Sequence, residues 1–232
     1  MNDRYAWAGG TEAWVRHGKA GQPLVIAALP PFEEANRTRA LMMRVLMQLT
    51  VHGISVALPD LPGTGESLVA TQDARLSHWR AAYAAASEEA RRDHPEIHSI
   101  AIRAGALIDV QADVASRWHL SPQDGASLHR ELGRIAKAAA LEDGDTVEWP
   151  PQVRVVEVAG NRLSNDLLAE LLIDYPPLPT PLRVVRMTGD AAAADRHFDG
   201  APLWRRAEPD QDLDLADALA DDIADWIARC AK

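Results

Sequence analysis

The chain has 232 residues, of which 47% are hydrophobic and 25% charged, a composition typical of a single soluble globular domain. Its 24 basic and 34 acidic residues give a formal net charge of −10, which disfavours nucleic acid and anionic membrane surfaces as partners but does not exclude a local basic cleft. The single cysteine, Cys230, excludes an internal disulfide and a cysteine zinc site.

Apolar patterns with the periods of strands and helices alternate along the chain. A continuous apolar run over residues 24–29, ended by two prolines, is typical of a strand buried on both faces. The expected strands are residues 24–29, 54–58, 97–102, 153–158 and 182–187. The expected helices are residues 34–52, 73–93, 104–117, 126–141, 165–173 and 213–230. This alternation predicts an α/β fold with a mostly parallel central sheet and helices on both faces.

Residues 121–151 carry proline and glycine breaks around one expected helix. We expect this segment to form a small insertion, a reduced lid over the sheet edge, within a single domain that spans residues 1–232. No stretch approaches the roughly 20 apolar residues of a membrane helix, and the N-terminus lacks the apolar core of a signal peptide. We therefore expect a cytoplasmic protein without a membrane span.

A turn-rich segment, residues 60–67 (DLPGTGES), follows the second expected strand. It resembles the Asp-x-x-Gly-x-Gly-x-Ser turn of α/β-hydrolases, in which the glycines permit the positive φ values of a sharp turn. A phosphate-binding nucleotide loop is the alternative for Gly-x-Gly after a strand. The sequence has no Gly-x-Gly-x-x-Gly and no Gly-Lys-Ser/Thr, so a nucleotide loop is not favoured.

The third expected strand runs into a second diagnostic turn. In α/β-hydrolases the nucleophile stands on a tight strand-to-helix turn, Gly-x-Ser-x-Gly, whose flanking residues must be small. Here Ala101 and Gly105 keep that steric frame, but Arg103 stands where the serine should be. A guanidinium stays protonated and has no nucleophilic lone pair, so Arg103 cannot form an acyl-enzyme. We expect a positive φ at Arg103, followed by a helix.

Four segments together resemble the exosortase A system-associated hydrolases, a branch of the α/β-hydrolase superfamily, and most closely their second type. Residues 31–39 (PFEEANRTR) are similar to that family's Pro-Phe-x-Glu-Glu-x-Asn-x-x-Arg, and residues 102–107 (IRAGAL) to its Leu-Arg-x-Gly-Ala-Leu. Residues 200–204 (GAPLW), followed by Glu208, are similar to its Gly-x-Pro-Phe-Trp and acidic residue, and the turn at residues 60–67 is the fourth segment. The resemblance implies an α/β-hydrolase fold and a genomic link to exopolysaccharide production and exosortase-dependent protein sorting.

Arg103 has two interpretations. At a helix N-terminus, its guanidinium and free backbone N–H groups would form a site for a small anion, with Phe32, Glu33 and Asp60 beside it at the carboxyl edge of the sheet. Alternatively, it pairs with a carboxylate and holds that edge together. The carboxylates available for such a pair are Asp60, Glu33, Glu34 and Asp190.

Two residues late in the chain are catalytic candidates. Asp190 lies where the acid of an α/β-hydrolase triad usually stands, and His197 follows it, so the triad order is nominally present with an inert first member. His94 and His98 are four residues apart, but Pro95 breaks the helix that would align them, and we expect no metal and no cofactor.

These observations favour a non-catalytic or cryptic α/β-hydrolase-like protein, accessory to an exopolysaccharide or exosortase-type envelope pathway. It would bind a small anionic ligand or a protein partner in the former active-site crevice. The alternative is an active hydrolase or esterase that acts on an acyl or glycan-linked ester without a serine nucleophile, for instance through water activated by histidine or aspartate. A third possibility is a scaffold that docks through its acidic C-terminal helix or its tryptophan-rich N-terminus.

Overall fold

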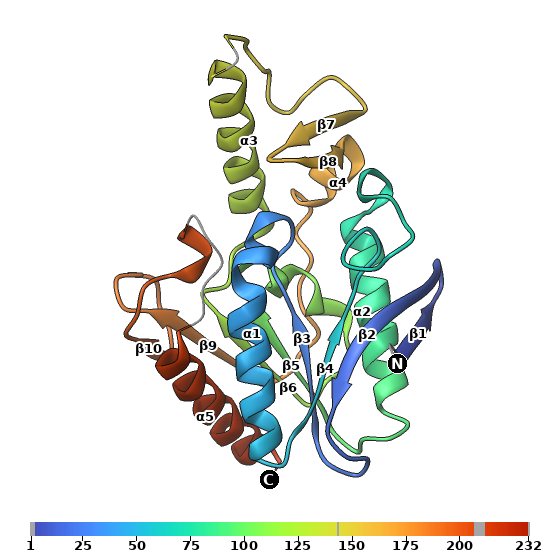
Figure 1. The fold of residues 1–232 in the computed structure, drawn as a ribbon, viewed down its shortest axis with the longest axis vertical. Helices are drawn as coiled ribbons and strands as arrows, with labels where there is room; N and C mark the ends of the chain where they lie inside the picture. Colours follow the sequence, from blue (N-terminus) through green and yellow to red (C-terminus); the bar gives the residue numbers. More distant parts are fainter. Residues whose placement is uncertain (1–2, 143, 207–211, 232) are drawn as a thin grey trace.

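The computed structural model describes residues 3–142, 144–206 and 212–231, so Glu208 lies outside the described residues. An eight-stranded sheet with the order β1-β2-β4-β3-β5-β6-β9-β10 forms its centre (Figure 1). The strands are β1 (Asp3–Trp7), β2 (Gly10–His17), β3 (Leu24–Ala28), β4 (Ser55–Pro59), β5 (Ile97–Ile102), β6 (Ser116–Leu120), β9 (Leu182–Met187) and β10 (Arg196–Phe198). From β4 to β10 all neighbours are parallel, whereas β1 and β2 pair antiparallel at one edge.

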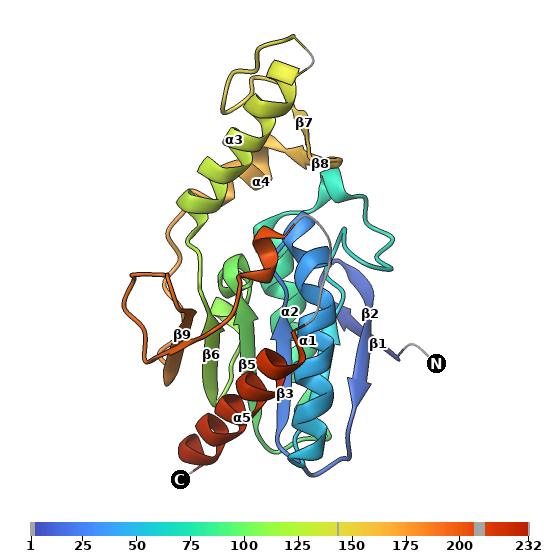
Figure 2. The same ribbon diagram turned by 60° about the vertical axis from the view of Figure 1, so that its left-hand side comes forward.

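Helices cover both faces of this sheet. The helices α1 (Glu33–Val51) and α5 (Leu213–Cys230) lie on one face, and α2 (Leu76–Ala90) lies on the other (Figures 1 and 2). None of the described helices is both long and apolar enough to cross a lipid bilayer.

Strand β3 shows why two cores form. Its side chains alternate between the faces, with Val25 and Ala27 in the core beneath α1 and α5, and Leu24, Ile26 and Ala28 in the core beneath α2. A strand buried on both faces has no polar alternation, which explains the continuous apolar run in the sequence.

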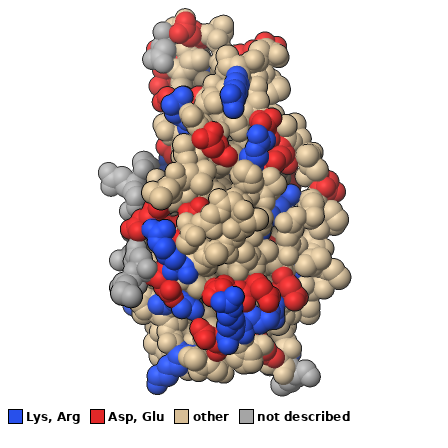
Figure 3. Space-filling view, turned by 90° about the vertical axis from the view of Figure 1, so that its right-hand side faces the viewer, with Lys and Arg blue, Asp and Glu red and all other residues tan. Residues whose placement is uncertain are grey.

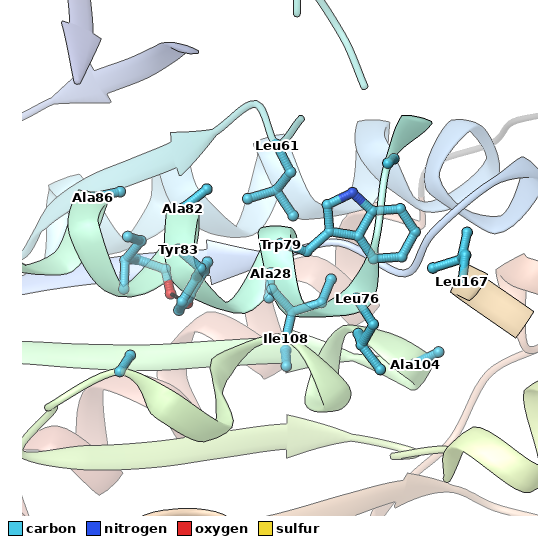
Figure 4. Close-up of a cluster of buried hydrophobic side chains, with 14 of the residues drawn as sticks. Ala28, Leu61, Leu76, Trp79, Ala82, Tyr83, Ala86, Ala104, Ile108 and Leu167 are labelled. Carbon is cyan, nitrogen blue, oxygen red and sulfur yellow. Dashed lines mark hydrogen bonds between the residues drawn. The ribbon is translucent and has the colours of Figure 1, made fainter. Parts of the chain in front are cut away.

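The core beneath α2 carries two aromatic side chains that also anchor backbone (Figure 4). The indole N–H of Trp79 donates to the carbonyl of Pro62 at 2.8 Å, and the hydroxyl of Tyr83 donates to the carbonyl of Ile26 at 2.9 Å. Both are buried, so each polar group has found the partner that burial requires. The Trp79 bond fixes the turn after β4 relative to α2.

The chain between β6 and β9, residues 121–181, forms a cap above the carboxyl ends of the parallel strands (Figures 1 and 2). The cap contains α3 (Gly125–Glu142), β7 (Val155–Val158), β8 (Asn161–Ser164) and α4 (Asn165–Glu170). Ala159 and Gly160, with φ of 48° and 76°, join β7 to β8 in the left-handed conformation of a tight hairpin turn. The cap thus begins at residue 121, where the insertion was expected to begin, but it continues well beyond residue 151.

One sequence-based expectation was wrong. Residues 104–117 do not form an α-helix, because the chain makes short 3₁₀ turns at Arg103–Leu107 and Asp109–Gln111 and then enters β6. Strand β6 was not expected from the sequence because it contains the polar residue Arg117. The side chain of Arg117 is buried, and its guanidinium donates to the carbonyls of Asp109 and Ala112. The expected strand over residues 153–158 exists as β7, but it belongs to the cap hairpin and not to the central sheet.

A buried carboxylate on α5 joins that helix to three strands. Asp222 accepts hydrogen bonds from Trp118 of β6 at 2.9 Å, from Arg183 of β9 at 2.8 Å and from Arg196 of β10 at 3.0 Å. Burial disfavours its charged form, but these hydrogen bonds outweigh burial and lower the pKa of Asp222 below its ordinary value.

We predict that Asp222→Asn lowers the free energy of unfolding by about 3 kcal/mol at pH 7, because the partly buried Arg183 loses its counter-charge. A carboxyl group with a lowered pKa stabilises the fold above its ordinary pKa of about 4, and this stabilisation is lost as the pH falls through the folded-state value. The deficit should therefore shrink between pH 5 and pH 3 in urea titrations. Asp225→Asn, an exposed control on the same helix, should change stability by less than about 0.5 kcal/mol; equal losses for both variants would contradict the assignment.

Candidate functional site

Adjacent strands of the sheet lead into residues with left-handed backbone. Arg103 follows β5 directly with φ 53°, Ser121 follows β6 directly with φ 46°, and Phe32 lies shortly after β3 with φ 64°. The positive φ expected at Arg103 is thus confirmed. For residues with side chains this conformation costs on the order of 1 kcal/mol or more, and such residues gather at functional sites.

The steric frame of the turn at Arg103 is built by its small neighbours. A Cβ at Gly105 would lie 2.4 Å from the carbonyl oxygen of Ala28, so only glycine fits there. Ala101 is fully buried and is paired with Ala28 of β3 and His119 of β6. The frame of a nucleophile turn is therefore complete although the residue at its tip is an arginine.

The helix N-terminus expected after Arg103 does not form. The turn leads into the 3₁₀ segment Arg103–Leu107, which is too short to present the aligned dipoles and free N–H groups of an α-helix. Any attraction for an anion at this place must come from side chains.

The guanidinium of Arg103 lies between two carboxylates without binding either tightly. Its Nε is 3.4 Å from Oε2 of Glu34 and its Nη2 is 3.7 Å from Oε2 of Glu131, while Nη1 is 3.5 Å from the carbonyl of Ser121. Its Cζ lies 5.3 Å from the centre of the Trp204 ring, within cation–π range. Nε and Nη2 also donate to Oε1 of Glu34, each at 3.5 Å, so Glu34 faces two nitrogens of the guanidinium. Charge-assisted hydrogen bonds normally measure about 2.7–2.9 Å, so all of these contacts are long.

Glu34 responds to this environment. Its side chain is only 15% exposed, and burial raises its pKa above the ordinary value. The charge of Arg103 opposes that rise, and the like charge of Glu131 adds to it. The positive charge of Arg103 therefore offsets the repulsion between the neighbouring carboxylates of Glu34 and Glu131.

The other expected ligand residues lie apart from Arg103. Phe32 and Asp60 line a separate cavity of about 370 Å³. The carboxylate of Asp60 accepts a hydrogen bond from the amide of Glu66 at 3.0 Å, and Glu33 pairs with Arg37 at 3.0 Å. Among the carboxylates considered for Arg103, the structure brings Glu34 to it.

Arg103 opens into a larger cleft of about 910 Å³ between the cap and the strand ends. Its lining cations are Arg37, Arg103, Arg130, Arg134, Lys137 and Arg205, and its lining carboxylates are Glu34 and Glu131. These side chains leave an excess of four positive charges in a chain whose formal net charge is −10. This cleft was not expected from the sequence, although basic residues at positions 130, 134 and 137 recur on one face of the helix expected there.

Asp190 and His197 do not form an acid–base pair. Arg186 holds the carboxylate of Asp190 at 2.7 Å, and Nε2 of His197 lies 3.2 Å from the backbone carbonyl of Asp190 instead of its carboxylate. Burial opposes ionisation of Asp190, but the amide of Ala192 and the charges of Arg186 and Arg103 lower its pKa. A base oriented by an acid requires contact with the carboxylate, and that contact is missing.

A buried Ser–Asp–His group is arranged for packing and not for catalysis. Ser99 donates to Oδ2 of Asp109 at 2.7 Å, and Nε2 of His119 lies 2.9 Å from the same oxygen. A catalytic histidine must contact the nucleophile, whereas here serine and histidine both bind the carboxylate, which is fully buried. Among the described residues, no group of three or more histidine, cysteine, aspartate or glutamate side chains is placed to hold a metal ion.

No protein-family model and no curated protein matches the sequence. Solved structures do resemble the fold: Est1E from Butyrivibrio proteoclasticus gives a TM-score of 0.69 at 14% identity over 100% of this chain and 99% of that one. A thermophilic esterase from Thermogutta terrifontis gives 0.62 at 13% identity over 100% of both chains. Alpha/beta hydrolase domain-containing protein 10 from mouse gives 0.60 at 12% identity over 99% of both. The expected α/β-hydrolase fold is confirmed, and at these identities the likeness concerns the fold alone.

We predict that Arg103→Gln lowers the free energy of unfolding by about 2 kcal/mol at pH 8, because Glu34 and Glu131 lose the charge between them. Without Arg103 the pKa of Glu34 rises further in the folded protein. The carboxyl group then takes up a proton on acidification, so the deficit should shrink towards pH 4.5. Urea titrations at both pH values measure this.

The double variant Glu34→Gln/Arg103→Gln is the control for this prediction. It should recover part of the loss at pH 8, since the buried carboxylate is removed together with its partner. A deficit that is independent of pH, or a double variant as unstable as the sum of the single ones, would show that Arg103 does not compensate Glu34.

Proposed function

We propose that this α/β-hydrolase-fold protein is non-catalytic and binds a small anionic ligand at Arg103, in the cleft between the cap and the strand ends. One observation carries the proposal: a partly buried, loosely paired guanidinium occupies the tip of the nucleophile turn in a cleft with an excess of positive charge. A guanidinium is a donor for carboxylate, phosphate or sulfate and cannot act as a nucleophile. A protein partner that presents an acidic side chain is the other occupant suited to this charge.

The surroundings of Arg103 also disfavour acyl transfer. Glu33 and Glu34 begin α1 at the place where α/β-hydrolases build part of the oxyanion hole. A carboxylate there would repel a developing oxyanion, whereas catalysis requires donors aimed at it. Of these two carboxylates, Glu34 contacts the guanidinium of Arg103 and Glu33 pairs with Arg37.

The biological setting that we propose rests on the sequence resemblance. The four segments similar to the second type of exosortase A system-associated hydrolases support an accessory role in an exopolysaccharide or exosortase-type envelope pathway, carried out in the cytoplasm. Genes for an exosortase and for polysaccharide synthesis beside this one are the expected observation. A neighbourhood without either would remove this part of the proposal and leave the ligand site untouched.

An active hydrolase on an acyl or glycan-linked ester is the second candidate, favoured by the fold likeness to a protein described as a thermophilic esterase. It would need water activated by a residue such as His197 or Asp190, with no covalent serine intermediate. Turnover of any member of a panel of acyl and acetylated-glycan esters, abolished by His197→Ala, would establish it.

We predict that a fluorophosphonate probe labels no serine of the protein and that the ester panel shows no turnover. Phosphate, sulfate or acetate should instead raise the free energy of unfolding of the wild type, by about 2.7 kcal/mol at roughly 100 times Kd. Thermal melts against chloride at equal ionic strength measure this, with Arg103→Gln losing the effect. Stoichiometric serine labelling, or equal stabilisation of both proteins, would refute the proposal.

A further inference from the structure

The cap contributes its own row of cations to the cleft. Arg130, Arg134 and Lys137 stand on α3 at positions i, i+4 and i+7, and all three line the 910 Å³ cleft. Arg130 donates to the hydroxyl of Ser127 at 2.9 Å. Within the part of the chain that the structure describes, none of the three has a carboxylate at ion-pair distance. We call these three residues the α3 stripe.

Packing on α3 explains why the stripe faces the cleft. The opposite side of the helix is apolar and buried, with Leu128, Leu132 and Ala136. Trp149 packs against Gly133, where a Cβ would come within 2.6 Å of the indole, and its ring lies at a tilt to that of His129 with centroids 5.4 Å apart. The helix therefore cannot turn the stripe away from the cleft without losing these contacts.

The stripe is unfavourable for the free protein. Like charges three or four residues apart on a helix destabilise it by a few tenths of a kcal/mol per pair. Solvent-exposed surfaces normally avoid this by mixing the two signs, as on the face shown in Figure 3, where acidic and basic side chains lie side by side. A one-sign row in an acidic chain points to a negatively charged occupant.

The opposite wall of the cleft carries a second group of cations. Arg103 and Arg37 are there, the latter donating to the carbonyl of Trp204 at 3.2 Å, together with Arg205. Between the walls lies Gln123, which is 9% exposed; its amide donates to Glu131 at 2.7 Å, and its Oε1 has no hydrogen-bond partner. The amide of Gln123 thus shares Oε2 of Glu131 with Arg103, so one carboxylate oxygen of α3 contacts both residues.

We infer that the ligand is a small polyvalent anion, with two or more phosphate or carboxylate groups, which bridges the Arg103 wall and the α3 stripe. The inference rests on the proposed function and extends it, because one monovalent anion at Arg103 leaves the stripe unneutralised. The cleft volume lies in the range of small-molecule sites, about 300–1,000 Å³, which favours a compact ligand over a polymer.

A valence series tests the inference. Isothermal titration at constant ionic strength, without divalent cations, compares acetate, phosphate, pyrophosphate and tripolyphosphate on the wild type. We expect Kd to fall by at least about tenfold from phosphate to tripolyphosphate, because the longer anion reaches both walls. In Arg134→Gln/Lys137→Gln the ratio of the two Kd values should fall to less than about threefold, while phosphate still binds at Arg103.

The matched control is Arg4→Gln/Lys19→Gln, which removes two positive charges from exposed positions in β1 and after β2. This variant should keep the full difference in Kd between phosphate and tripolyphosphate. That result would show that the difference comes from a local site and not from the net charge of the protein. Equal affinity of the wild type for phosphate and tripolyphosphate would overturn the inference and leave the proposed function standing. If neither phosphate nor tripolyphosphate binds, both the inference and the proposed function are overturned. If a long oligonucleotide or heparin binds but tripolyphosphate does not, the ligand is a polymer and the inference of a small ligand is wrong.

Discussion

The guanidinium of Arg103 is the contact on which the site depends, because it joins the end of β5 to α1 through Glu34 and to the cap through Glu131. A permanent charge in a partly buried position needs opposite charge nearby, and two carboxylates provide it. Those carboxylates in turn require Arg103, since burial and mutual repulsion both raise the pKa of Glu34. The cap, the first helix and the tip of the turn thus form one electrostatic unit.

Much of the fold could be predicted because its central elements carry local signals. The continuous apolar run of β3 and the amphipathic α5, which the sequence bounds at residues 213–230, need no tertiary information. Strand β6 could not be predicted in this way, because Arg117 and His119 interrupt its apolar pattern. Both side chains are tolerated in the sheet only through partners that the fold brings to them, chiefly Asp109 and backbone carbonyls.

The position of Arg103 at the turn could be predicted from the sequence, whereas the cleft around it could not. Small residues at positions 101 and 105 were enough to place Arg103 at a strained turn, because that geometry depends on near neighbours. The cleft depends on where α3 stands, and that position is set by contacts of the cap such as Trp149 on Gly133. The helix N-terminus expected after Arg103 does not form, since the chain there makes a 3₁₀ turn and soon re-enters the sheet.

The close approach of Gly105 to Ala28 has an evolutionary consequence. The backbone of the turn is held by Gly105 and Ala101, and neither contact involves the side chain at the tip. A hydroxyl and a guanidinium can therefore be exchanged at that position without rebuilding the architecture around it. Such an exchange then requires changes only in the charged residues that face the tip of the turn.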